Sequence, residues 1–130
     1  MKLTAKGIAR DYIRNGAGTN VFRAVESTDF ELPEGQLIEI IGRSGSGKTT
    51  FINMMSGLLV PSEGTVTLDD LDLYAMNDSE RSIVRNRSIG IIPQGQTGLQ
   101  SLTVLENVLA PAMMYGNTGR EDKARELLEL

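Results

Sequence analysis

The sequence predicts an α/β fold in which a glycine-rich loop joins an apolar strand to a helix. Residues 3–13 and 21–32 mix apolar and polar positions as strands do, and the turn-forming stretch "NGAGTN" lies between them. The stretch "IIGRSGSGKTTF" (residues 40–51) places glycines between an apolar run and a helical pattern. Further helix starts follow toward the C-terminus. Strands therefore dominate the first part of the chain and helices the last.

The elements around the glycines follow from local signals. "PEGQ" (residues 33–36) is a turn that leads into "LIEII", a predicted apolar strand ending at Ile41. After the glycines, "TTFINMMSGLL" carries apolar residues at helical spacing, and Gly57 fits a left-handed helix end. This is the strand, loop and helix order that a phosphate-binding loop requires.

The middle of the chain combines a strand, a helix and a second apolar run. "VPSEGTVTLDDLDL" predicts a turn, a strand and another turn. Asn77 and Glu80 fit a helix start, which predicts a short polar helix to about Arg87. "SIGIIPQ" (residues 88–94) predicts a return to an apolar strand.

The C-terminal region carries two patterns of reciprocal helix capping. Thr103 with Glu106, and Thr118 with Glu121, have the three-residue spacing of a capping box. The last predicted helix places its apolar residues on one face, namely Ala124, Leu127 and Leu128.

Composition restricts the chemistry. The chain of 130 residues suits one domain, and it contains no cysteine and no histidine, which excludes thiol nucleophiles and imidazole ligands. A net charge of −4 argues against a nucleic-acid partner. No apolar run has the length of a signal peptide or a membrane span, so we expect a cytoplasmic protein. Any membrane attachment would then need a partner.

The loop residues Gly42, Gly47, Lys48 and Thr49 match the pattern G-x-x-x-x-G-K-[ST]. Several consecutive backbone N–H groups can converge on an anion only where glycine permits the backbone geometry. The positive end of the following helix adds to this. Lys48 can reach the β- and γ-phosphates of a nucleotide, and the Thr49 hydroxyl can ligate Mg²⁺. The competing interpretation is an ordinary Ser/Gly loop.

Nearly the whole chain resembles the ATP-binding subunits of ABC transporters. "GRSGSGKTT" resembles their Walker A segment, "RDYIRNG" their A-loop, and "RSIGIIPQ" the strand that ends in their Q-loop. "PEGQLIEIIG" resembles the turn and strand before Walker A, with Gln36 where glutamate is usual. "PSEGTVTLDDLDL" is similar to the hairpin of their antiparallel β-subdomain. "LTVLENV" is most similar to the branch of lipoprotein-release and macrolide-export ATPases.

The resemblance implies a fold and its boundaries. It implies an α/β P-loop NTPase core with an antiparallel β-subdomain, incomplete at the C-terminus. Residues 1–130 would then be a partial nucleotide-binding domain. Residues 1–93 would form the β-subdomain and Walker A core, and residues 94–130 the Q-loop and the start of the helical subdomain. The unfinished sheet leaves apolar surface uncovered, which predicts limited stability or self-association.

The resemblance also implies roles for single residues. Tyr12 would stack on adenine, Thr49 would ligate Mg²⁺, and Gln94 would reach the Mg²⁺ and the attacking water. Lys48 and Gln94 would take part in catalysis. The residues that would bind the phosphates are Gly42, Ser44, Gly45, Ser46, Gly47, Lys48, Thr49 and Thr50. Pro93 stands where an aromatic residue is usual, which leaves the Q-loop backbone open.

Each role has a plainer alternative. Tyr12 could be a strand aromatic packed on a sheet, and Gln94 could be a loop amide at a strand end. "TVTLDD" ends in two acids, but its alternating threonines indicate a half-exposed strand. Asp69, Asp70 and Asp72 are therefore interpreted as turn residues.

The resemblance implies ATP and Mg²⁺ as cofactors and two protein partners. These are a transmembrane permease subunit at the inner face of the membrane and a second nucleotide-binding domain in a head-to-tail dimer. The sequence holds no "LSGGQ"-like signature and no later apolar strand ending in Asp-Glu, so we expect ATP binding with negligible hydrolysis. Three alternatives stay open, namely a small P-loop phosphotransferase, an ABC ATPase without a transport role, and a scaffold with a vestigial loop.

Overall fold

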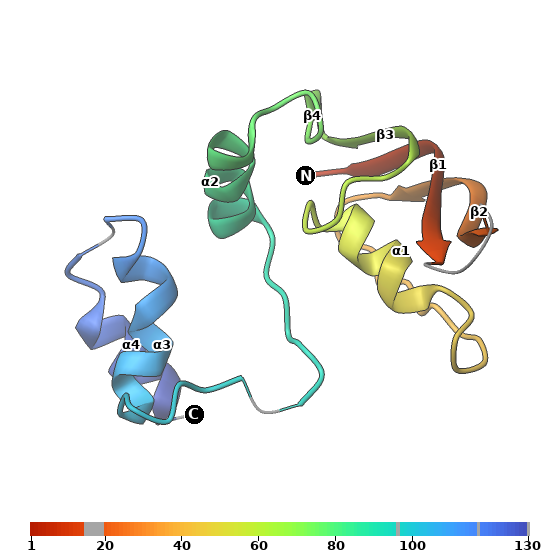
Figure 1. Cartoon of the computed structure of the whole chain (residues 1–130). Helices are drawn as coiled ribbons and strands as arrows, with labels where there is room; N and C mark the ends of the chain where they lie inside the picture. Colours follow the sequence, from red (N-terminus) through yellow and green to blue (C-terminus); the bar gives the residue numbers. More distant parts are fainter. Residues whose placement is uncertain (15–19, 96, 117, 130) are drawn as a thin grey trace. The chain divides into compact units, whose positions relative to one another are not determined.

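The computed structural model describes residues 1–14, 20–95, 97–116 and 118–129. The chain divides into two compact units, Met1–Ser82 and Ile83–Leu130 (Figure 1). The first unit holds the sheet and the helix that follows the glycines. The second is helical.

The sheet of the first unit has four strands, β1 (Leu3–Arg14), β2 (Asn20–Leu32), β3 (Glu63–Leu68) and β4 (Leu71–Asp72). Their order in the sheet is β2-β1-β3-β4, and every neighbouring pair is antiparallel. Its long hairpin confirms the two strands predicted from residues 3–13 and 21–32, with Leu3 opposite Leu32 and Tyr12 opposite Phe22. Most of the predicted turn "NGAGTN" lies outside the described residues.

Helix α1 (Lys48–Met55) packs against β1 and β2 (Figure 1). The rings of Phe51 on α1 and Phe30 on β2 meet edge to face, with centroids 5.3 Å apart. Gly57 ends the helix with φ at 74°, as the sequence predicts. The largest fully buried side chains of this unit are Ile8, Met54, Val66 and Leu73. The core therefore lies between α1 and the sheet.

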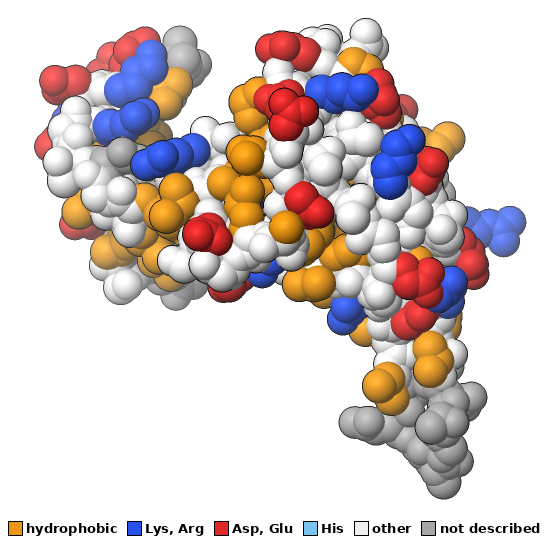
Figure 2. Space-filling view, turned by 90° about the horizontal axis from the view of Figure 1, so that it is seen from above, with side chains coloured by type: hydrophobic (Ala, Val, Ile, Leu, Met, Phe, Trp, Pro, Cys, Tyr) orange, Lys and Arg blue, Asp and Glu red, His pale blue; other side chains and the backbone are white. Residues whose placement is uncertain are grey.

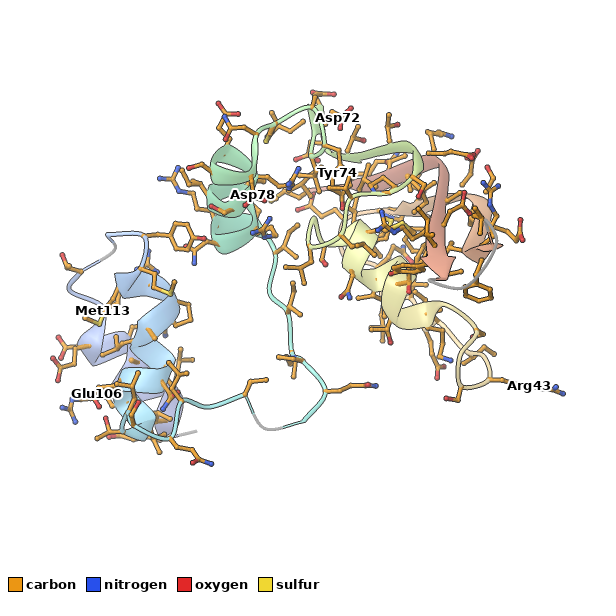
Figure 3. The ribbon with its side chains drawn as sticks, viewed as in Figure 1. Arg43, Asp72, Tyr74, Asp78, Glu106 and Met113 are labelled. Atoms are coloured by element: carbon orange, nitrogen blue, oxygen red, sulfur yellow. The ribbon has the colours of Figure 1, made fainter. Side chains whose placement is uncertain are left out.

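The turn region after β4 is tied to the end of α1 through Tyr74. Its hydroxyl lies 2.5 Å from the carbonyl oxygen of Met54 and 2.6 Å from that of Leu59. Asp72 Oδ1 accepts a hydrogen bond of 2.9 Å from the backbone N–H of Tyr74, and the two residues lie close together in Figure 3. Asp69 and Asp70 lie exposed in a turn, as the sequence predicts. Asp72 is instead a half-buried residue of β4, so its interpretation as a solvated turn residue is wrong, and its carboxylate orders the turn that follows.

Two apolar runs predicted as strands have no regular structure. Residues 37–41 and residues 89–94 are irregular, and Leu37 and Ile92 are 97% and 98% exposed. Both strand predictions are wrong. A strand that is apolar throughout depends on neighbours for its backbone hydrogen bonds and for cover on both faces. Among the described residues, none pairs with either run.

Helix α2 (Asp78–Ser88) begins in the first unit and ends in the second. It begins where Asn77 and Glu80 predicted a helix start, and the Glu80 N–H donates to Asn77 Oδ1 at 3.0 Å. The Asn77 N–H donates to Glu80 Oε2 at 3.2 Å. The sequence prediction of this helix is confirmed.

Helix α3 (Val104–Met113) begins with the first of the two predicted capping boxes. Thr103 accepts from the N–H of Glu106, whose carboxylate accepts from the N–H of Thr103 at 2.7 Å. The bond from the Thr103 N–H, together with one of 2.8 Å from the Thr103 hydroxyl to the same carboxylate, holds the pKa of Glu106 below its ordinary value. Helix α4 (Glu121–Leu128) has Arg120 as its N-cap, so the capping role predicted for Thr118 is wrong. Gly119 has φ at 79°, a left-handed conformation that does not belong to an α-helix, so α4 begins only after it, at Glu121.

Asn107 on α3 holds the segment that precedes the helix. Its side chain exchanges hydrogen bonds with the backbone of Leu99, at 2.7 Å and 3.0 Å, and donates to the carbonyl oxygen of Thr103 at 2.9 Å.

None of the helices in the described part of the chain combines the length and apolarity that a bilayer crossing requires. Apolar side chains do reach the surface of both units, among acidic and basic ones (Figure 2).

Candidate functional site

The glycine-rich loop (residues 42–47) leads directly into α1. Gly45 and Gly47 have φ at 77° and 86°, in the left-handed region that favours glycine. A Cβ at Gly47 would overlap the carbonyl oxygen of Ala24 and lie 3.2 Å from a methyl group of Val25. Strand β2 and the end of the loop are therefore in contact at a position that admits only glycine.

The ammonium group of Lys48 is held by the loop itself. Its Nζ donates to the carbonyl oxygens of Gly42 and Arg43, at 2.7 Å each, and to Ser46 Oγ at 3.3 Å. A Cβ at Gly42 would lie 2.8 Å from that same Ser46 oxygen. The loop thus closes around the ammonium with little room for larger side chains.

The start of α1 favours an anion. Gly47 is the N-cap of α1. Because glycine has no side chain, it makes no side-chain cap hydrogen bond to the backbone N–H groups of the first turn. Thr49 is exposed and Thr50 is half-buried on that turn. Ser44 and Ser46 are exposed in the loop, and Arg43 extends from its tip into solvent (Figure 3). Several donors and one cation therefore gather at the positive end of the helix.

A pocket of about 510 Å³ lies between the loop and β2. Phe51 and Ile40 give it apolar walls, Lys48 brings positive charge, and Arg23 and Glu26 line it with charges of opposite sign. The residues that line it from the loop and the start of α1 are Gly42, Ser46, Gly47 and Lys48. The pocket therefore places apolar walls beside the ammonium of Lys48, which is the group of its lining suited to an anion.

Arg23 at the pocket edge is fixed by two carboxylates. Its guanidinium makes hydrogen bonds of 2.8 Å and 2.9 Å to Asp11 and one of 2.6 Å to Glu63. The hydrogen bonds that Arg23 donates lower the pKa of Asp11, and the two carboxylates that accept them raise the pKa of Arg23. The three side chains join β1, β2 and β3, and sequence reasoning missed this cluster because its members lie far apart along the chain.

Tyr12 lies near the end of β1, opposite Phe22, and 38% of its surface is exposed. The guanidinium carbon of Arg10 lies 4.9 Å from its ring centroid. Sequence reasoning singled out Tyr12 but missed Arg10. The spacing of the two residues could have indicated that Arg10 lies beside Tyr12, because residues two apart on a strand lie on the same face.

Gln94 belongs to the second unit. It is exposed in an irregular segment between Pro93 and Gly95, whose φ is 92°. The structure thus places the loop residues and Tyr12 in the first unit, and Gln94 outside it.

A family model described as ABC transporter matches residues 25–130. The chain belongs to the ABC transporter family. It covers part of an ABC transporter ATP-binding domain, which confirms the family and the nucleotide-binding class predicted from the sequence.

Curated members of the ABC transporter family support the match along most of the chain. The lipoprotein-releasing system ATP-binding protein LolD of Myxococcus xanthus is 33% identical over 98% of this chain and 56% of its own length. LolD 1 of Rhodopirellula baltica is 36% identical over 98% of this chain and 55% of its own length. An uncharacterized ABC transporter ATP-binding protein of Thermotoga maritima is 40% identical over 82% of this chain and 47% of its own length. The chain spans about half the length of these relatives.

Solved ABC cassettes have the same fold. The dimeric structure of MJ0796, a bacterial ABC transporter cassette, matches 98% of this chain and 54% of its own, with a TM-score of 0.85 and 29% identity. A second dimeric structure of MJ0796, in a post-hydrolysis state bound to ADP and Pi, also matches with a TM-score of 0.85 and 29% identity. The chain therefore has the ABC cassette fold over the part that it spans, and the predicted fold class is confirmed.

Proposed function

We propose that this chain binds ATP with Mg²⁺ through the glycine-rich loop and the start of α1. The observation that carries the proposal is the position of Lys48 Nζ, 2.7 Å from two loop carbonyl oxygens at the positive end of a helix. The positive φ of Gly45 and Gly47 supports it, since the loop backbone can then approach a phosphate closely. The binding of ADP and Pi by the similar cassette MJ0796 agrees with this ligand class.

The proposed roles of single residues follow the resemblance of this sequence to ABC ATPases. Tyr12 stacks on adenine, Thr49 ligates Mg²⁺, and Gln94 contacts the Mg²⁺ during hydrolysis in the complete protein. The phosphates are bound by Gly42, Ser44, Gly45, Ser46, Gly47, Lys48, Thr49 and Thr50. Residues 1–93 supply the β-subdomain and Walker A core, and residues 94–130 supply the Q-loop and the first part of the helical subdomain.

The complete protein is proposed to couple ATP hydrolysis to transport across a membrane. Similarity to LolD, a lipoprotein-releasing system ATP-binding protein, supports an export role. The dimeric structures of MJ0796 support pairing of two nucleotide-binding domains. The transport partner is a permease subunit, which would hold the protein at the inner face of the membrane.

An apolar pocket of about 680 Å³ in the second unit offers one surface for such a partner. It lies along α3 and includes Val104, Val108 and Pro111. Asn107 fixes its rim, because the same side chain holds Leu99. A hydrophobic pocket beside a rigid rim suits an inserted apolar side chain.

Binding is tested by titrating the 130-residue chain with ATP in the presence of Mg²⁺. We expect saturable binding that Lys48→Ala weakens about tenfold or more, because charge-assisted hydrogen bonds to phosphate are lost. Arg43→Ala is the matched control, since its side chain extends into solvent from the same loop. Wild-type binding that Lys48→Ala leaves unchanged would contradict the proposal.

The chain alone is proposed to bind ATP without sustained hydrolysis. Its sequence has no signature motif and no apolar strand ending in Asp-Glu to supply a general base. The measurement is phosphate release under multiple-turnover conditions. Repeated turnovers that Lys48→Ala abolishes would overturn this part of the proposal and leave the binding part standing.

A further inference from the structure

Arg10 and Tyr12 form a stacked pair on β1. They are two residues apart on the strand, so their side chains lie on the same face of the sheet. The guanidinium carbon lies over the ring, 4.9 Å from its centroid, within the range of a cation–π interaction. The guanidinium covers part of the ring, and 38% of Tyr12 stays exposed.

The same guanidinium is anchored away from the ring. Arg10 Nη1 donates to the carbonyl oxygen of Val60 at 2.7 Å, in the segment that follows α1. Two hydrogen bonds close the same junction, from the Ser62 N–H to the Ala9 carbonyl at 2.8 Å and from the Asp11 N–H to Ser62 Oγ at 3.0 Å. Arg10 is half-buried there, so its position is set by the fold.

We infer that Arg10 is a positioning residue that holds the plane of the Tyr12 ring for a nucleobase. The inference rests on the proposed function, in which Tyr12 stacks on adenine. A tyrosine side chain has two free torsions, and fixing them before the ligand arrives removes an entropic cost from binding. A cation on one face also draws on the electron density of the ring, which favours a π-rich base on the other.

This role has a signature that a purely structural role lacks. Arg10 acts on the nucleobase and not on the phosphates. Removing its guanidinium should therefore lower the affinity for ATP but not the affinity for inorganic tripolyphosphate. The ratio of the two affinities, measured with Mg²⁺ on the full 130-residue chain, isolates the contribution of the base. Arg10→Met keeps an unbranched side chain but removes the guanidinium and its charge, and Arg10→Lys restores the charge without the planar group.

We expect Arg10→Met to lower this ratio about twofold to fivefold, which corresponds to an exposed cation–π contact. Tripolyphosphate affinity should stay at the wild-type value, and Arg10→Lys should recover part of the ratio. Tyr12→Leu should lower the ratio about fivefold or more, as the loss of a stacking platform does. In the Tyr12→Leu background, Arg10→Met should have no further effect.

Ser62→Ala is the matched structural control. It removes the hydrogen bond from Asp11 to Ser62 at the same junction without touching the stacked pair. It should leave the ratio unchanged, even if thermal unfolding shows a stability loss similar to that of Arg10→Met. A ratio that falls as much in Ser62→Ala as in Arg10→Met would overturn the inference, because general loosening of the junction would then explain both.

The remaining outcomes separate the inference from the proposed function. If the chain binds neither ATP nor tripolyphosphate, the proposed function fails and the inference falls with it. If Tyr12→Leu leaves the ratio unchanged, adenine stacking fails, and so does the role of Arg10. If Tyr12→Leu lowers the ratio but Arg10→Met does not, Tyr12 keeps its role and the inference alone is overturned.

Discussion

The carbonyl oxygen of Ala24 on β2 occupies the space that a side chain at Gly47 would need. Gly47 also has φ at 86°, so a larger residue there meets both an unfavourable backbone conformation and an overlap with β2. The end of the glycine-rich loop is thus defined by contact with Ala24, which lies 23 residues earlier in the chain.

We expect Gly47→Ala to displace the loop and to weaken both folding and ATP binding. Strained backbone of this kind costs about 1–3 kcal/mol before the overlap is added. Gly35→Ala is the matched control, because Gly35 has φ at 72° but nothing within 4 Å of an added Cβ. Urea unfolding of both variants separates the two effects. Equal losses in stability would show that the contact with Ala24 contributes nothing.

The edge-to-face contact of Phe30 with Phe51 fixes α1 on β2. Leucine at either position keeps apolar volume but removes the ring geometry. A double-mutant cycle with Phe30→Leu and Phe51→Leu should therefore give a coupling free energy of about 0.5–1.5 kcal/mol. Urea unfolding supplies the four stabilities. Additive losses within error would mean that the two rings contribute only their separate burial.

The capping box of α3 provides a test of the helix starts. Thr103→Ala removes the acceptor for the Glu106 N–H and should destabilise the helix by about 1 kcal/mol. Thr118→Ala is the control, because α4 begins with Arg120 as its N-cap and without a side-chain cap. Circular dichroism during thermal unfolding should show a loss for the first variant and little change for the second. The reverse order would contradict the described helix starts.

The ion pair of Asp11 with Arg23 predicts a loss of stability in acid. Its bonds lower the pKa of Asp11 in the folded chain, so the folded state favours the ionised carboxylate. The stabilisation is present above the ordinary pKa of 3.8 and is lost as the pH falls through the lower, folded value. Asp11→Asn should remove this component, and the urea midpoints of the two proteins should converge toward low pH. A difference that stays constant through this range would contradict the assignment.

Local signals in the sequence were sufficient for the elements whose partners lie nearby. The hairpin of β1 and β2, the left-handed Gly57 and the capping boxes at Asn77 and Thr103 each depend on neighbouring residues. The runs at 37–41 and 89–94 failed because an apolar pattern states a preference for burial, while a strand also needs a partner for its backbone.

The candidate site was predictable where chemistry follows a fixed spacing. The glycines, Lys48 and Thr49 belong to one continuous motif, and the structure places them together at the start of α1. The contacts of Arg10 with Val60 and of Gly47 with Ala24 join distant segments, so they depend on the tertiary fold. The role of each residue in the site stays a prediction until binding is measured.

The three hydrogen bonds of Lys48 affect the entropy cost of binding a phosphate at the loop. A lysine side chain that is free in solution loses about 2 kcal/mol of rotamer entropy when it is immobilised. Here that loss occurs during folding, because the ammonium is already held by Gly42, Arg43 and Ser46. An arriving phosphate would exchange the partners of an ordered cation and would not have to capture a mobile one.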